Sequence, residues 1–116
     1  MLNIKDIVKE LNLELTSTKL NLDREISGGY ASDLLSDVIA NSKKDNVWIT
    51  LQMHENIIAV ASMKELSGVI IVNGRRPAQE IIAKAEQENI TLLLTELSTF
   101  EIVGRLYKLG IHGNME

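Results

Sequence analysis

The sequence predicts an α/β fold in which a mainly parallel sheet is flanked by helices in a three-layer arrangement, all in one domain over residues 1–116. Three short apolar segments, at 47–51, 69–72 and 91–95, begin at equal intervals along the chain. An amphipathic segment follows each of them, and this alternation is typical of strand–helix units that build a parallel sheet. The segment VIIV (69–72) is apolar at every position, as expected of a strand covered on both faces.

The amino-terminal part of the chain carries shorter signals. Residues 4–11 repeat apolar side chains at helical spacing and predict a short helix. Residues 13–17 alternate between apolar and polar and predict a half-buried strand. Residues 18–29 are irregular and end in two glycines. Ser32 is then placed to cap a helix whose apolar side includes Leu35 and Val38.

The predicted helices of the second half cover residues 55–66, 77–88 and 98–109. Pro77 suits the first helical position, where its missing N–H costs nothing. Ser98 and Glu101 have the spacing of a capping box. Gly110 follows the last apolar residue of its helix, as a C-terminal cap does.

Composition excludes several classes of protein. The net charge of −4 argues against nucleic acid as the main partner, because nucleic-acid-binding surfaces carry a basic excess. The absence of cysteine excludes disulfides, zinc–thiolate sites and thiol catalysis. No apolar run approaches the ~18 residues that a membrane span needs. The charged residues Lys5 and Asp6 stand where a signal peptide would be apolar, so we expect a cytoplasmic protein.

Polar loops follow the predicted strands at 52–56, 73–76 and 95–98. Ligands of open α/β sheets bind beyond the carboxyl ends of the strands. Free N–H groups at the starts of the following helices favour an anion there. The candidate ligand-binding residues at this edge are Asn73, Gly74, Arg75, Arg76, Ser98 and Thr99. The alternative is that Asn73-Gly74 only forms a turn, the arginines are solvated and Ser98 only caps its helix.

The tandem glycines Gly28-Gly29 complete the candidate ligand site together with Ser32. Both a tight turn and a close approach of a ligand use the backbone freedom of glycine. We expect a turn that delivers Tyr30 and the Ser32-capped helix onto the sheet, with a positive φ angle at one glycine or both. The pair belongs to neither of the common glycine-rich nucleotide-binding motifs.

No catalytic residue and no metal ligand is expected. The chain lacks the nucleophile motif G-x-S-x-G and the zinc motif H-E-x-x-H. A metal site needs three or four convergent ligands, so His54 is expected to be a surface residue. Asp33 and Asp37 lie four residues apart, on one side of the predicted helix, where they either bind a cation or are solvated.

Three stretches of the chain are distinctive: DREISGGYASDLLSDV, VWITLQMHENIIAVASMKELSGVIIVNGRRP and LLLTELSTFEIVGRL. Together they resemble the DRTGG domain, which is similar to the N-terminal domain of bacterial HPr kinase/phosphorylase. The resemblance covers about residues 3–109. The signature appears here as Asp23-Arg24-Glu25-Ile26-Ser27-Gly28-Gly29, with a changed and longer spacing.

This resemblance implies an α/β fold, frequent self-association as a homodimer, and a regulatory or accessory role. Members accompany CBS domains, phosphotransacetylases and pyrophosphatases, and some stand-alone forms are encoded near iron hydrogenases. The kinase's catalytic machinery belongs to a separate domain, and no catalytic residue carries over. We therefore expect a non-enzymatic regulatory module without a cofactor that binds a small anionic metabolite or nucleotide. The alternative is a protein–protein adaptor or dimerisation module linked to a redox system such as a hydrogenase.

Overall fold

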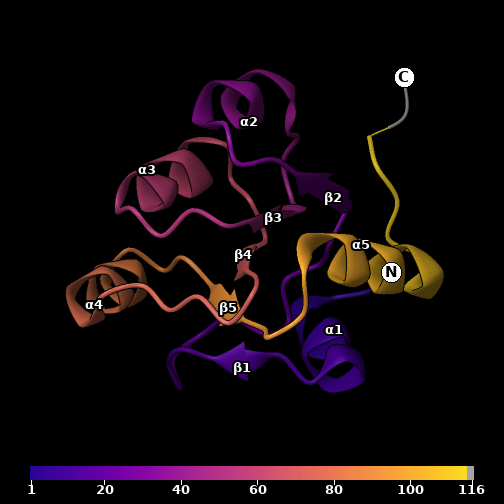
Figure 1. Ribbon diagram of the computed structural model, residues 1–116, viewed down its shortest axis with the longest axis horizontal. Helices are drawn as coiled ribbons and strands as arrows, with labels where there is room; N and C mark the ends of the chain where they lie inside the picture. The colour runs from indigo at the N-terminus through magenta and orange to yellow at the C-terminus, as the bar shows by residue number, and fades with distance from the viewer. Residues whose placement is uncertain (115–116) are drawn as a thin grey trace.

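The computed structural model describes residues 1–114, which form one five-stranded sheet between two layers of helices (Figure 1). The strands lie in the order β1-β5-β4-β3-β2, and four of them are parallel. The strands are β1 (Glu14–Leu15), β2 (Gly28–Ala31), β3 (Asn46–Thr50), β4 (Gly68–Ile71) and β5 (Leu92–Leu94). The helices are α1 (Ile4–Leu11), α2 (Leu35–Asn41), α3 (Asn56–Met63), α4 (Gln79–Gln87) and α5 (Thr99–Leu109). The predicted fold class is confirmed.

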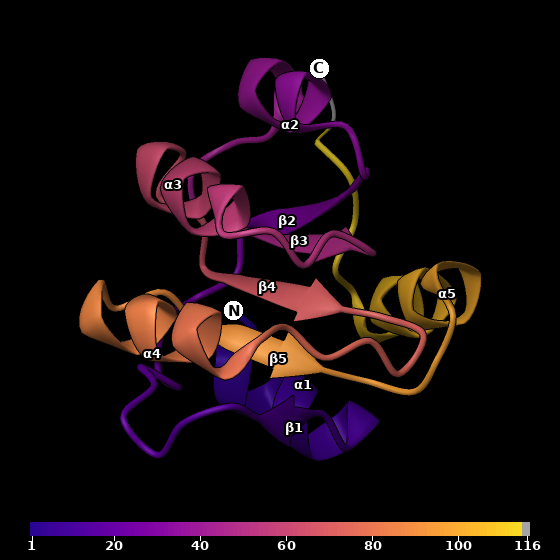
Figure 2. The same cartoon turned by 60° about the vertical axis from the view of Figure 1, so that its left-hand side comes forward.

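The two faces of the sheet carry separate apolar cores. Helices α2, α3 and α4 cover one face, around Trp48 and Ile58. Helices α1 and α5 cover the other face, around Ile70 and Ile102 (Figures 1 and 2). Strand β4 is buried at every residue because it lies in the middle of the sheet under both layers. Its uninterrupted apolar sequence follows from this position.

The three predicted central strands are confirmed as parallel neighbours, each followed by a helix. Each of their boundaries differs from the predicted one by one residue. The predicted strand at 13–17 is shorter in the structure: only Glu14 and Leu15 pair, antiparallel to Leu94 and Leu93 of β5. This short strand closes one edge of the sheet.

Strand β2 was not predicted, because its segment begins with two glycines and glycine is depleted in strands. Gly28 to Ala31 nevertheless pair in parallel register with Asn46 to Ile49 of β3. The strand–helix alternation therefore starts one unit earlier than the sequence indicated, and β2 forms the second edge of the sheet.

Two of the predicted helix starts are wrong. Helix α2 begins at Leu35, and its N-cap is Leu34 with no side-chain hydrogen bond, so Ser32 does not cap it. Helix α4 begins at Gln79 after the N-cap Ala78, so Pro77 precedes the helix instead of occupying its first position. The predicted cap at the end of α5 is confirmed by Gly110, whose φ is 108°.

Candidate functional site

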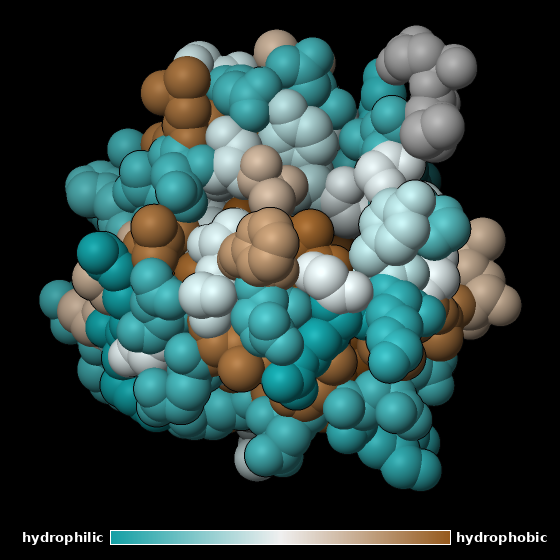
Figure 3. Space-filling model, turned by 45° about the vertical axis from the view of Figure 1, so that its right-hand side comes forward, coloured by the Kyte–Doolittle hydropathy of each residue, from teal (hydrophilic) through white to brown (hydrophobic). Residues whose placement is uncertain are grey.

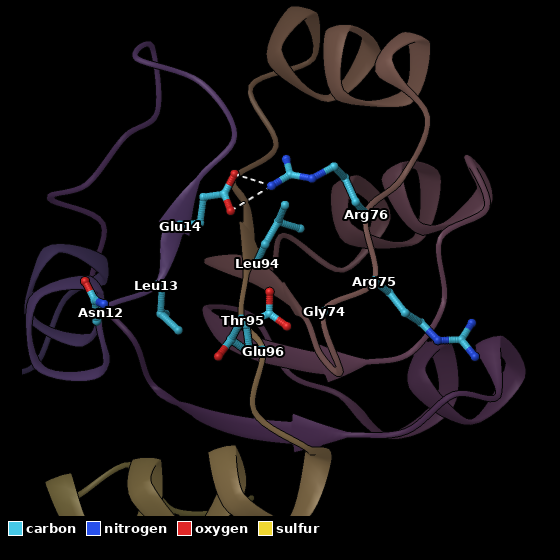
Figure 4. Close-up of a pocket in the computed structure, with 9 residues that line it drawn as sticks. All are labelled: Asn12, Leu13, Glu14, Gly74, Arg75, Arg76, Leu94, Thr95 and Glu96. Atoms are coloured by element: carbon cyan, nitrogen blue, oxygen red, sulfur yellow. Dashed lines mark hydrogen bonds and ion pairs between the residues drawn. The ribbon is translucent and has the colours of Figure 1, made fainter.

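A cavity of about 390 Å³ lies at the carboxyl ends of β4 and β5, beside the edge strand β1. Three chain segments line it, residues 12–14, 74–76 and 94–96 (Figure 4). The cavity therefore lies at the edge of the sheet where ligands of open α/β folds bind. Its volume falls in the range of small-molecule sites, roughly 300–1,000 Å³.

A tight turn between β4 and α4 forms one wall of the cavity. Asn73 and Gly74 have φ angles of 62° and 68°, and the Arg75 N–H donates to the Val72 carbonyl at 3.2 Å. Two positive φ angles in succession are the property for which Asn-Gly is favoured in turns. The Gly74 N–H donates to the Thr95 carbonyl at 2.9 Å, which joins this turn to the segment after β5. The turn fixes the backbone from which Arg75 and Arg76 project.

The side chains of Arg75 and Arg76 point in different directions. Arg76 reaches across the cavity and donates from Nη2 to both carboxylate oxygens of Glu14, at 2.6 and 2.8 Å. Arg75 is exposed and points away from the cavity centre (Figure 4). Among residues 1–114 it forms no ion pair within 4 Å. Only one of the two guanidinium groups is therefore already held by a carboxylate.

Glu96 brings a second carboxylate to the site. Its Oε2 lies 2.5 Å from the place that a Cβ atom would take on Gly74, so the carboxylate packs against the bare backbone of the turn. Glu14 and Glu96 balance the charges of Arg75 and Arg76. The wall of the cavity thus carries two carboxylates and the Arg76 guanidinium, while the Arg75 guanidinium points outward from the same turn.

The predicted residues Ser98 and Thr99 lie beyond the wall of the cavity and do not line it. Ser98 is the N-cap of α5, and its Oγ accepts from the Glu101 N–H at 3.2 Å. The Glu101 carboxylate accepts from Arg105 Nε at 3.1 Å instead of returning to the Ser98 N–H. The predicted reciprocal capping box is therefore only half formed.

Ser32 follows β2 at the opposite edge of the sheet from the cavity. Its carbonyl accepts from Trp48 Nε1 at 2.8 Å, and its Oγ accepts from the Leu34 N–H at 3.2 Å. These contacts fix the connection into α2. The structure does not bring Ser32 together with the arginines.

Asp33 and Asp37 do not converge on a common cation position. Asp33 lies before α2 and accepts from the Thr50 hydroxyl at 2.9 Å and the Leu51 N–H at 2.7 Å. Asp37 lies on α2 and accepts from the Tyr30 hydroxyl and the Asn41 amide, each at 2.8 Å. Within residues 1–114 no group of three or more histidines, aspartates and glutamates has a geometry suited to a metal.

The Asp37 network shifts two pKa values in opposite directions. Hydrogen bonding to Asp37 raises the pKa of the Tyr30 hydroxyl, and burial adds to the shift. Hydrogen bonds from Ser32, Tyr30 and Asn41 lower the pKa of the Asp37 carboxyl. These hydrogen bonds stabilise the ionised carboxylate, and the one from the Tyr30 hydroxyl also stabilises the protonated phenol. The network ties β2 to α2, away from the cavity.

The two histidines are distant in sequence and contact different residues. The Nδ1 atom of His54, an exposed residue, accepts from the Asn56 N–H at 3.1 Å at the start of α3. His112 stacks on Tyr107 with ring centroids 4.2 Å apart. Both lie on the surface.

Residues 6–109 match the DRTGG domain. The chain belongs to the DRTGG domain family. No protein with a curated description matches the sequence.

A solved structure with the same fold contains the CBS and DRTGG domains of the regulatory region of Clostridium perfringens pyrophosphatase. That protein is complexed with its activator, diadenosine tetraphosphate. The TM-score is 0.70 at 18% sequence identity, and the match covers 87% of this chain and 44% of that chain. The DRTGG domain described here thus spans less than half of that regulatory region.

The signature segment of this DRTGG domain lies at the amino end of the parallel strands, away from the cavity. Arg24 donates from Nε and Nη2 to Asp45 Oδ1 at 3.2 and 3.0 Å, and from Nη2 to the Glu65 carbonyl at 2.6 Å. Asp45 and Glu65 have positive φ angles of 66° and 52° in the turns before β3 and β4. Arg24 therefore holds two strained turns together, a structural role that spacing in the sequence did not indicate.

The prediction of a turn at Gly28-Gly29 is wrong. Both glycines belong to β2, and among residues 1–114 positive φ angles at glycine occur only at Gly74 and Gly110. Gly28 instead allows a close approach of the chain: a Cβ atom there would lie 2.8 Å from the His112 carbonyl oxygen. The Gly29 N–H donates to this same oxygen at 2.9 Å. Because the glycines have no side chains, the segment around His112 can pack against the free edge of β2.

Proposed function

We propose that this DRTGG domain is a non-enzymatic regulatory module that binds a small anionic metabolite or nucleotide. The cavity beside Glu14 and Arg76 is the proposed site, and the observation that carries the proposal is the arginine pair on its wall. Arg75 and Arg76 follow a rigid Asn-Gly turn at the carboxyl edge of the sheet. A guanidinium group can hold a phosphate or carboxylate through two parallel hydrogen bonds.

The ion pair between Glu14 and Arg76 is weak enough for a ligand anion to replace Glu14 as the partner of Arg76. Both side chains are more than half exposed, at 52% and 57%, and such exposed pairs contribute only about 0–1 kcal/mol. An incoming anion can therefore displace Glu14 from Arg76 at small cost, and the exposed side chain of Arg75 can turn toward the same anion. The displaced carboxylate and Glu96 are then free to accept hydrogen bonds from donors on the ligand.

The fold neighbour supports a regulatory role and a nucleotide as the ligand class. Its CBS and DRTGG domains form a regulatory region, and its activator is a nucleotide that carries four phosphates. We propose for this chain the same kind of role, which is regulation without catalysis. Further parts of the proposal are a cytoplasmic location, which rests on the charged amino-terminal residues, and bacterial origin and homodimer formation, which rest on the family resemblance.

A thermal-shift screen of the intact chain against nucleotides and phosphorylated metabolites tests this proposal. A ligand that binds only the native state raises the melting temperature, by an amount that grows with its concentration. The double variant Arg75→Ala/Arg76→Ala should lose the shift while keeping nearly the same melting temperature without ligand, because both side chains are exposed. Arg105→Ala, which removes an exposed arginine on α5, is the matched control and should keep the shift.

A shift that survives in the double variant would remove this cavity as the site. Absence of any shift across the screen would contradict ligand binding itself.

A second candidate function is a protein–protein adaptor or dimerisation module. The observation that favours it is a set of large apolar side chains exposed on helices, with Phe100 exposed at 90% and Met63 at 63%. Exposed apolar patches mark interaction surfaces. The link to a hydrogenase or other redox system rests on the family resemblance alone.

A further inference from the structure

The outer edge of strand β2 carries backbone groups that have no hydrogen-bond partner. On the inner edge, the Ser32 N–H that follows the strand donates to the Ile49 carbonyl of β3 at 3.2 Å. Backbone groups alternate between the two edges of a strand, so those of Gly29 and Ala31 point away from β3. The Gly29 N–H donates to the His112 carbonyl at 2.9 Å. The Ala31 N–H and the carbonyls of Gly29 and Ala31 remain free within the part of the chain that the structure describes.

A slot of about 120 Å³ opens beside this edge, between β2 and α5. Gly29 and Ala31 pair with Val47 and Ile49 of β3, whose side chains are buried in the core on the α5 side of the sheet. Paired residues of neighbouring strands point to the same face. On this face β2 therefore presents only a hydrogen atom and a methyl group, so the apolar layer beside α5 is not filled out to the edge of the sheet.

The slot has the size of one side chain. Its volume equals that of about four water molecules. Small-molecule sites are larger, at roughly 300–1,000 Å³. The slot walls are mainly apolar and include Ile49, Val103, Leu106 and Tyr107. The side of the molecule on which α5 lies shows brown apolar surface in separate areas among teal polar residues (Figure 3).

The carboxyl-terminal segment of the chain shows how a backbone binds this edge. The segment leaves α5 and passes along β2 (Figures 1 and 2). The His112 carbonyl accepts from the Gly29 N–H, and the Asn114 amide exchanges hydrogen bonds of 2.8 and 3.1 Å with the amide of Asn46 at the start of β3. The segment therefore runs antiparallel to β2 and covers the first half of its edge. The end of the strand, at Ala31, stays open.

We propose that this edge binds an extended segment of another protein, which pairs with Ala31 and places one apolar side chain in the slot. In strand addition to an exposed sheet edge, backbone hydrogen bonds supply affinity and side-chain pockets supply specificity. The residue that pairs with Ala31 accepts from its N–H and donates to its carbonyl. Its side chain points to the same face as that of Ala31, which is the face where the slot opens.

The covered half of the edge favours a foreign segment over a second copy of this chain. The β2 strand of a second copy has its own carboxyl-terminal segment on the same edge, so it offers only its last residue for pairing. An extended segment without such a cover can pair along its whole length. The proposal gives the adaptor candidate a docking surface that uses neither Phe100 nor the cavity at Arg76.

Amide chemical-shift mapping of the intact ¹⁵N-labelled chain tests the proposal with blocked pentapeptides. The probes are acetyl-Thr-Val-Xaa-Val-Thr-amide, in which Xaa is Phe, Leu or Ala. The Phe and Leu peptides should shift the amide signals of Ala31 and Tyr107. We expect dissociation constants on the order of 0.1–1 mM, because the contact is far smaller than the roughly 800 Å² per partner of a stable interface. The Ala peptide leaves the slot empty and should bind at least about tenfold more weakly.

Removal of single backbone hydrogen bonds separates strand addition from apolar contact alone. Ala31→Pro removes the free N–H and keeps the hydrogen bonds between β2 and β3, since an edge strand tolerates proline where the N–H faces outward. It should weaken binding of the Phe peptide at least about tenfold. Ala31→Gly keeps the N–H and is the matched control, which should bind nearly as the wild type does.

A peptide variant makes the same test without altering the protein. Methylation of the backbone nitrogen of Xaa in the Phe peptide removes the donor to the Ala31 carbonyl. The methylated peptide should also bind at least about tenfold more weakly to the wild type. This arm keeps its meaning even where Ala31→Pro unfolds, which circular dichroism shows.

No shift at Ala31 with the Phe or Leu peptide at about 2 mM, where even weak complexes populate, would overturn the proposal. Equal binding of the methylated and unmethylated peptides would overturn it too. Self-association of the wild type that Ala31→Pro abolishes would place a second copy at this edge and exclude the foreign segment. The Arg75→Ala/Arg76→Ala variant should bind the Phe peptide unchanged, so failure at this edge and failure of the ligand site are distinguishable.

Discussion

Gly28 lies so close to the segment around His112, which is distant in sequence, that no room is left between them for a methyl group. The His112 carbonyl oxygen lies 2.8 Å from where a Cβ atom would be, and this oxygen belongs to the backbone instead of a flexible side chain. Gly28→Ala should therefore lower the free energy of unfolding by about 1–3 kcal/mol, the usual cost of forcing an extra carbon into a packed site. Urea denaturation measures the change.

Gly29→Ala is the matched control one residue along the same strand. The nearest atom to its added Cβ would be Ile111 Cγ2 at 3.5 Å, an ordinary contact. The φ angle of Gly29 is not in the positive region, so the methyl group should leave the stability unchanged or raise it by up to about 1 kcal/mol. Equal destabilisation by both substitutions would contradict the close-approach explanation.

The hydrogen bonds to Asp37 predict a dependence of stability on acid pH. Because they lower the pKa of this carboxyl in the folded state, its ionised form stabilises the fold. The contribution is complete above the pKa of an unfolded aspartate, about 3.9, and is lost as the pH falls through the lowered value. The difference in unfolding free energy between wild type and Asp37→Asn should therefore shrink between pH 6 and strongly acid solution, on the order of pH 2–3.

Urea denaturation of both proteins across this pH range measures the difference. A constant gap would show that Asp37 acts only through neutral hydrogen bonds. The raised pKa of Tyr30 has the opposite sign: its stabilising contribution is present below about pH 10 and is lost at higher pH.

At the scale of elements, the two serines that the sequence placed as helix caps differ in the structure. Ser98 caps α5 through a hydrogen bond from the Glu101 N–H, whereas Ser32 lies before α2 and caps nothing. Ser98→Ala should lower the free energy of unfolding by about 0.5–2 kcal/mol, the usual cost of losing an N-cap. Ser32→Ala should cost less, since it loses the hydrogen bonds of its hydroxyl to Leu34 and Asp37 only.

Thermal or urea unfolding of the two variants beside wild type measures both effects. A larger loss for Ser32→Ala would mean that the connection from β2 to α2 matters more than the α5 cap.

The sequence predicted the elements whose periodicity is set by burial. Strand β4 and helix α1 were recognisable because each presents an uninterrupted or regularly repeated apolar pattern to a core. Strand β2 was not recognisable, because it begins with two glycines, which are depleted in strands, and because its parallel partner β3 is distant in sequence. Local propensity cannot report such a long-range contact.

At the scale of the whole molecule, the sequence indicated some of the residues that line the cavity and missed others, and their role in binding a ligand stays a prediction. The sequence placed Arg75 and Arg76 at the carboxyl edge, and the structure puts a cavity there. The carboxylates of Glu14 and Glu96 were missed, because Glu14 reaches the site through the antiparallel pairing of β1, which the loop pattern does not show. The sequence also grouped Gly28 with the site, although the strand direction carries it to the opposite end of the sheet.

The three-layer arrangement explains why these two regions are separate. The family signature around Arg24 and Gly28 holds the amino end of the sheet and the edge strand β2. The cavity and its arginines occupy the carboxyl end near the other edge strand, β1. The amino end of the sheet thus maintains the fold, and we assign ligand recognition to the carboxyl end.

Amide chemical-shift mapping by NMR tests this assignment most directly, because the intact chain has a mass of only 12.9 kDa. The titrants are mononucleotides and diadenosine tetraphosphate, added separately to the ¹⁵N-labelled protein. Our account predicts that a binding nucleotide shifts the amide signals of Gly74, Arg75, Arg76, Thr95 and Glu96, and that the Arg75→Ala/Arg76→Ala variant shows no such shifts. Shifts confined to β2 and the signature segment, or none with any of these nucleotides at millimolar concentration, would contradict it.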